Sequence, residues 1–108
     1  MEGCCMDEGG LYAYCYMVKR GKPAACIPVH VRDINKARQI ASQELCLSYS
    51  ESLANDWFTF WVYQYPHILD VIKSLPQVPR TAYDHWLLGK LFGYEEAAIH
   101  EYIKSTLS

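Results

Sequence analysis

Two histidines have a carboxylate as their direct neighbour in the sequence, and such pairs are the first candidates for acid–base chemistry. The pairs are Asp84-His85 and His100-Glu101. A catalytic histidine needs a carboxylate that orients its ring toward a nucleophile or a water molecule. Neighbouring side chains on a helix point roughly 100° apart, so Asp84 is poorly placed to orient His85. We therefore expect no enzymatic activity.

The cysteines are the next candidates, because thiolates can bind a metal or act as nucleophiles. The chain has five, so a complete set of disulfides would leave one thiol unpaired. Cys4, Cys5 and Cys15 could share a metal ion, yet zinc sites usually contain closely spaced ligand pairs, and no Cys-x-x-Cys occurs. We expect no metal and no cofactor. Cys26 and Cys46 lie in apolar segments and are expected to be buried thiols.

The composition predicts one globular domain over residues 1–108, with 51% hydrophobic and 20% charged residues. Ten Lys and Arg against twelve Asp and Glu give a net charge of −2, which disfavours direct binding of nucleic acid. No apolar run has the ~18–20 residues that a membrane span needs. The polar start of the chain does not look like a secretory signal, so a cytoplasmic protein is expected.

The elements that must position any site can be predicted from periodicity. Alternation over residues 11–18 predicts a strand, which a turn at 19–23 would join to a second strand at 24–31 as a hairpin. Apolar residues recur at helical spacing from Asp33 to Leu45, whereas residues 48–56 have loop composition. Residues 57–65 are aromatic on both faces and predict a third strand, and residues 66–75 a short helix.

These elements predict an α+β fold. It would contain a small antiparallel sheet, made of the β-hairpin and the one aromatic strand, with helices on one side. Residues 1–10, with three glycines, are expected to be a frayed N-terminus.

The C-terminal stretch 81–107 is expected to form two helices around a corner at Phe92-Gly93-Tyr94. Its pattern resembles the helix-turn-helix of DNA-binding proteins. In that family a small residue lies four positions before the turn glycine and an aliphatic residue six positions after it. Gly89, Gly93 and Ile99 match these three constraints, which are those of tight helix packing.

The second helix of this pair argues against DNA binding. Its outward positions are expected to be Glu95, Glu96, His100 and Glu101, where a reader of the major groove usually presents Arg, Lys, Asn or Gln. A helix-turn-helix regulator with basic contacts from elsewhere, such as residues 19, 20 and 22, is the alternative. A small-molecule or metal-binding domain is a third possibility.

Three segments, GKPAACIPV, PHILDVIKSLP and YDHWLLGKLFGYEEAAIHEYI, resemble those of small accessory proteins carried by phages and mobile elements of Gram-positive bacteria. The resemblance implies a protein that binds and blocks a host protein, such as a CRISPR nuclease or another defence component. It transfers no functional residue.

We therefore expect a non-enzymatic protein-binding module whose partner is a host protein. The acidic helix is expected to engage a basic nucleic-acid channel on that partner, and aromatic side chains are expected to act as hydrophobic anchors. The candidate contact residues are Trp57, Trp61, Tyr94, Glu95, Glu96 and Glu101.

Overall fold

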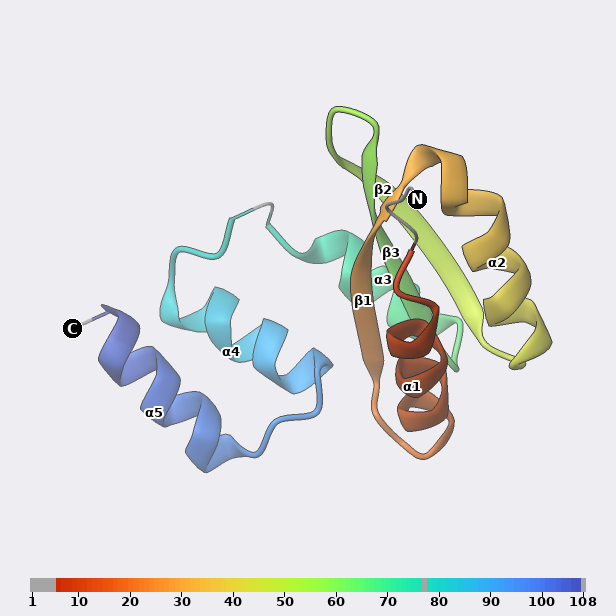
Figure 1. Ribbon diagram of the computed structural model, residues 1–108. Coiled ribbons are helices and arrows are strands. Elements are labelled where there is room, and N and C mark those ends of the chain that lie inside the picture. The colour runs from red at the N-terminus through yellow and green to blue at the C-terminus, as the bar shows by residue number, and fades with distance from the viewer. Residues whose placement is uncertain (1–5, 77, 108) are drawn as a thin grey trace.

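The computed structural model describes residues 6–76 and 78–107 and consists of one small sheet with helices packed on it (Figure 1). The helices are α1 (Glu8–Lys19), α2 (Ile34–Gln43), α3 (His67–Ser74), α4 (Ala82–Leu91) and α5 (Glu96–Leu107), with a short 3-10 helix, η1 (Val31–Asp33), before α2. The strands are β1 (Ala24–His30), β2 (Leu47–Ala54) and β3 (Trp57–Tyr63).

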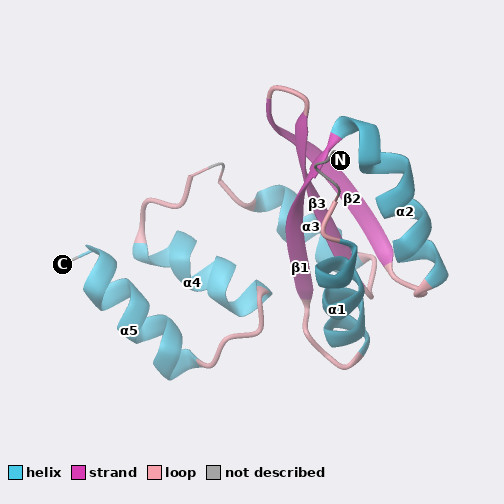
Figure 2. Ribbon diagram, in the orientation of Figure 1, coloured by secondary structure: helices cyan, strands magenta, loops and turns pink. Residues whose placement is uncertain are grey.

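The α+β class with a small antiparallel sheet is confirmed. The strand order is β1-β3-β2, and β3 pairs antiparallel with both neighbours. The aromatic strand predicted over 57–65 is therefore the central strand, which explains why both of its faces are apolar. Figure 2 shows the three strands between two groups of helices.

The predicted strand over residues 11–18 is wrong, because this segment belongs to α1. Its buried residues are Leu11, Cys15 and Val18, which follow the i, i+4, i+7 spacing of a helix face. The alternating tyrosines hid that spacing. The start signal was Asp7, whose carboxylate accepts a hydrogen bond of 2.9 Å from the backbone N–H of Gly10.

The hairpin is also different from the expected one. It joins β2, which had been interpreted as a loop, to β3 through a turn in which Asp56 has a φ of 54°. The serine-rich β2 is an edge strand with mostly exposed or half-buried side chains, so its composition lacks the apolar alternation that marks a strand. The β1 segment does form a strand, but it pairs with β3.

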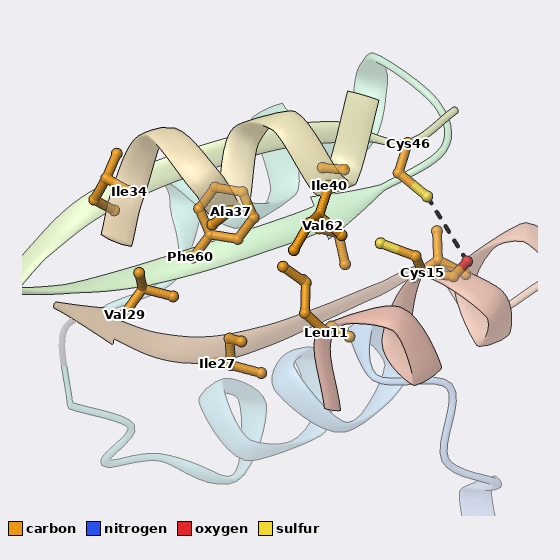
Figure 3. Packing of buried hydrophobic residues seen from close by; sticks show 13 residues of the cluster. Leu11, Cys15, Ile27, Val29, Ile34, Ala37, Ile40, Cys46, Phe60 and Val62 are labelled. Atoms are coloured by element: carbon orange, nitrogen blue, oxygen red, sulfur yellow. Dashed lines mark hydrogen bonds between the residues drawn. The ribbon is translucent and has the colours of Figure 1, made fainter. Parts of the chain in front are cut away.

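Helices cover both faces of the sheet, and the expectation that they lie on one side is wrong. On one face α1 and α2 bury a core that includes Leu11, Ile40 and Phe60 (Figure 3). On the other face α3 and α4 pack against Trp61 and Tyr63 of β3. The alternating side chains of β3 thus supply both cores.

Residues 1–10 were expected to be a frayed N-terminus, but residues 8–10 form the first turn of α1. Residues 1–5 lie outside the described part of the chain. Within that part, every helix is too short or too polar to cross a lipid bilayer.

The molecule measures 43 × 30 × 23 Å and has a radius of gyration of 14.6 Å, against about 13 Å for a compact chain of this length. The elongation reflects α4 and α5, which lie to one side of the sheet, with the C-terminal end of α4 packed on it (Figure 1).

Candidate partner-binding surface

The start of α4 is fixed by a capping box. The hydroxyl of Thr81 accepts a hydrogen bond from the backbone N–H of Asp84, and the Asp84 carboxylate accepts from the backbone N–H groups of Thr81 and Arg80. These hydrogen bonds hold the pKa of Asp84 below its usual value. The carboxylate therefore caps the helix and does not orient the neighbouring His85, whose ring packs edge-on against Tyr102.

The corner between α4 and α5 depends on two glycines. Gly93 has a φ of 83°, which other residues rarely adopt. A Cβ at Gly89 would lie 2.7 Å from Cγ1 of Ile99, the buried residue of α5. The helix-turn-helix-like geometry predicted from Gly89, Gly93 and Ile99 is thus present.

The turn between α1 and β1 holds this corner against the sheet. The ammonium group of Lys22 donates a hydrogen bond to the backbone oxygen of Phe92 and lies 5.5 Å and 5.6 Å from the ring centres of Phe92 and Tyr94. Pro23 packs against Gly93. Burial lowers the pKa of Lys22, but the hydrogen bond and the two ring contacts tie its side chain to the corner.

A polar cluster joins the two helices on one flank of the pair. Both carboxylate oxygens of Glu96 accept from the indole N–H of Trp86, at 3.0 and 3.2 Å. Lys90 and His100 lie 3.3 and 3.2 Å from the same carboxylate. The hydrogen bond from Trp86 is the main cause of the lowered pKa of Glu96. We call these four residues the α4–α5 clamp.

An apolar cleft of about 540 Å³ lies between α4, α5 and the chain before them. This volume is in the range of sites that bury a ligand or several side chains. We call it the α4–α5 cleft. Its lining is Pro79, His85, Leu88, Gly89, Phe92, Tyr94, Ala98, Ile99 and Tyr102.

Three of the predicted contact residues lie at or beside this cleft. Tyr94 lines it and is 59% exposed. Glu95 and Glu101 stand three residues before and after Ala98, so they are its neighbours on the helix surface. Both are exposed and form no ion pair with a described residue. Glu96, in contrast, is occupied by the clamp.

The two predicted tryptophan anchors are not part of this surface. Trp61 is 4% exposed, stacks on Phe92 with ring centres 5.8 Å apart, and donates its indole N–H to Glu51. The structure therefore does not offer Trp61 to a partner. Trp57 is 41% exposed, but it lies edge-on to His30 where β3 begins.

The thiols of the described residues are placed for packing. Cys15 and Cys46 are buried, and Cys46 donates a weak hydrogen bond to the backbone oxygen of Cys15 (Figure 3). Burial raises the pKa of Cys15 to about 12 and that of Cys26 to about 11. No cluster of metal ligands occurs within residues 6–76 and 78–107; Cys4 and Cys5 lie outside these ranges.

The cations considered for DNA contact are engaged with the protein. Lys19 pairs with Glu44 at 3.2 Å, and the guanidinium of Arg20 lies 5.5 Å from the ring centre of Tyr16. Lys22 is bound at the corner.

Comparisons with known proteins add no assignment. No protein-family model matches the chain, and no curated protein is significantly similar to it in sequence.

Sequence reasoning missed the cleft as a site because its lining had been assigned to the core. Leu88, Phe92 and Tyr102 read equally well as a packing stripe. The signal that was available is the four-residue spacing of Tyr94, Ala98 and Tyr102, which places one large aromatic residue before the small Ala98 and one after it.

Proposed function

We propose that the protein is a non-catalytic, cytoplasmic binding module that docks a host protein through the α4–α5 cleft. The observation that carries this proposal is the cleft itself, an apolar hollow of about 540 Å³ bordered by exposed tyrosines. Exposed apolar hollows with aromatic borders are typical of protein-binding surfaces.

The charge beside the cleft supports a partner with a basic surface. The carboxylates of Glu95 and Glu101 have no described partner within the protein, and the nearby Lys22 is held by Phe92. Together with the resemblance to phage and mobile-element proteins, this favours an inhibitor of a bacterial defence component. A CRISPR nuclease fits the proposal, because its nucleic-acid channel is strongly positive.

A pull-down from bacterial lysate with the tagged protein tests the proposal, with and without nuclease treatment. We expect one stoichiometric protein that is retained after nuclease and lost with Ala98→Trp, which fills the cleft from an exposed position. Asp70→Lys, a charge change on α3 at an exposed site, should retain it. Capture that is equal for all three proteins would show that the cleft is not the binding site.

A helix-turn-helix regulator is the second candidate, favoured by the close approach of Gly89 to Ile99 and the turn at Gly93. It predicts a shift of duplex DNA in electrophoresis at physiological salt. We expect no shift, since Glu95, directly before α5, and Glu101 on α5 are both exposed and carboxylates repel phosphates.

A further inference from the structure

Helix α5 leaves most of its apolar side chains exposed. Ile99 is its one buried residue, and Tyr102 and Leu107 are 56% and 44% exposed. A helix of twelve residues is only marginally stable by itself in water and depends on packing of an apolar face. Part of the apolar face of α5 borders the cleft, so a ligand seated there would supply packing that the chain does not provide.

The apolar lining of the cleft favours a helix over an extended peptide as its ligand. Polar side-chain atoms in the lining occur only on His85, Tyr94 and Tyr102. An extended peptide would bring unpaired backbone N–H and C=O groups against these apolar walls, at a considerable cost in free energy. A helix satisfies its backbone internally and packs its side chains between those of two neighbouring helices.

The carboxylates beside the cleft favour a positively charged helix. Glu95 and Glu101 are exposed beside Ala98 and have no described counter-ion. A helix lying in the cleft would bring its flanking positions next to these carboxylates. Lys or Arg at those positions would be attracted, whereas Asp or Glu would be repelled.

From these three observations we infer that the α4–α5 cleft binds a basic amphipathic helix of the partner protein. The helix presents apolar side chains at i, i+3 or i+4 and i+7 to the cleft and places Lys or Arg on either side of that stripe. Bound in this way it forms a three-helix unit with α4 and α5. This inference rests on the proposed function and names the part of the partner that is recognised.

Selection from two displayed peptide libraries tests the inference without knowledge of the partner. One library is built on a helical scaffold with randomised surface positions, and the other is unconstrained. The bait is the full chain, and enriched peptides are then synthesised and measured by fluorescence anisotropy. The variants are Ala98→Trp, which fills the cleft, and Glu101→Lys, with Asp70→Lys as the matched charge reversal on α3.

We expect the helical library to yield peptides with a net positive charge and an apolar stripe at helical spacing. Ala98→Trp should weaken their binding at least tenfold. Glu101→Lys should weaken it about fivefold at low salt, the upper range for an exposed ion pair, and less at high salt. Asp70→Lys should leave binding unchanged. Circular dichroism of each variant checks that the fold is retained, and Tyr102→Ser provides a second cleft variant.

Four results would overturn the inference. They are no enrichment from the helical library, enrichment of acidic helices, enrichment of extended peptides alone, and binding that both cleft variants leave intact. Saturable binding of the apolar dye anilinonaphthalene sulfonate that Ala98→Trp abolishes, with no helix enriched, would instead assign the cleft to a small apolar ligand.

The lysate pull-down separates this inference from the proposed function. A captured protein that depends on the cleft, combined with a failed helix selection, would leave the binding function standing and refute the helical occupant. Failure of both experiments would remove the binding function itself.

Discussion

The contact between Gly89 and Ile99 offers the sharpest test of the α4–α5 geometry. A methyl group at Gly89 would lie 2.7 Å from Cγ1 and 3.0 Å from Cδ1 of Ile99. Ile99 is 3% exposed and branched at Cβ, so its side chain has little freedom to move away. Gly89→Ala should therefore force α4 and α5 apart.

The expected magnitude is the difference between two opposing effects. Inserting a methyl group into a packed contact costs about 1–3 kcal/mol, whereas replacing glycine by alanine inside a helix returns about 0.5–1 kcal/mol. The two ranges leave a net loss between about 0 and 2.5 kcal/mol, so the free energy of unfolding should fall by about 1 kcal/mol in the native background. In an Ile99→Ala background the obstacle is absent, and Gly89→Ala should stabilise the protein.

The assay is a double-mutant cycle measured by urea denaturation, with hydrogen exchange of residues 96–107 to detect local opening of α5. Gly9→Ala provides the matched control, because a Cβ at this helical glycine would meet only Asp7 Oδ1, at 3.9 Å. It should be neutral or stabilising. The reasoning would be refuted if Gly89→Ala raised the stability of the native background as much as that of Ile99→Ala.

Three further predictions follow from the charged and buried groups. The pKa of Glu96 is lowered in the folded protein, so the clamp stabilises the protein at pH values above 4.5, the ordinary pKa of this carboxyl group. This contribution is lost as the pH falls through the lower pKa of the folded state. Near-UV circular dichroism should show an acid transition that Glu96→Gln removes. Because burial raises the pKa of Cys15 to about 12 and also raises that of Cys46, both thiols should react with a disulfide reagent at pH 8 only as fast as the protein opens, and urea should accelerate the reaction. Lys22→Met keeps the apolar stem but removes the hydrogen bond to the Phe92 carbonyl, so the denaturation midpoint should fall, by about 1 kcal/mol in stability.

The elements that sequence predicted correctly are those whose apolar pattern is dictated by burial. The central strand from Trp57 to Tyr63 is apolar because both faces are covered, and α2 shows its buried side through Ile34, Ala37 and Ile40. The corner at Gly93 could be predicted because its backbone conformation and the contact at Gly89 both require glycine.

The failures have physical causes as well. In α1, Tyr12 and Tyr16 are exposed, so aromatic residues appeared where a helix normally presents polar ones. In β2, Ser48 and Ser50 are half-buried beside their register partners Val62 and Phe60 of β3. The apolar side chains on this face therefore come from the neighbouring strand, and β2 itself lacks a hydrophobic pattern. Neither effect is visible without the tertiary structure.

The candidate site was predictable only in part, because exposure is a tertiary property. Tyr94, Glu95 and Glu101 were selected for type and are exposed. Trp61 was selected for the same reason but lies beneath Phe92, and Glu96 is bound by Trp86. The sequence shows which side chains have the chemistry to bind a partner. It does not show which of them are already buried or hydrogen-bonded within the protein.

The way in which α5 is held bears directly on its role. The helix has one buried residue, yet its orientation is fixed by the approach of Gly89, the carboxylate of Glu96 and the bond from Lys22 to the corner. A helix retained only for stability would gain more by burying a wider apolar face. A helix that must present a cleft gains from being held rigidly while remaining exposed, because a preorganised surface loses less conformational entropy on binding. The fixed corner and the open apolar face of the C-terminal pair are therefore the features that the proposed docking role requires.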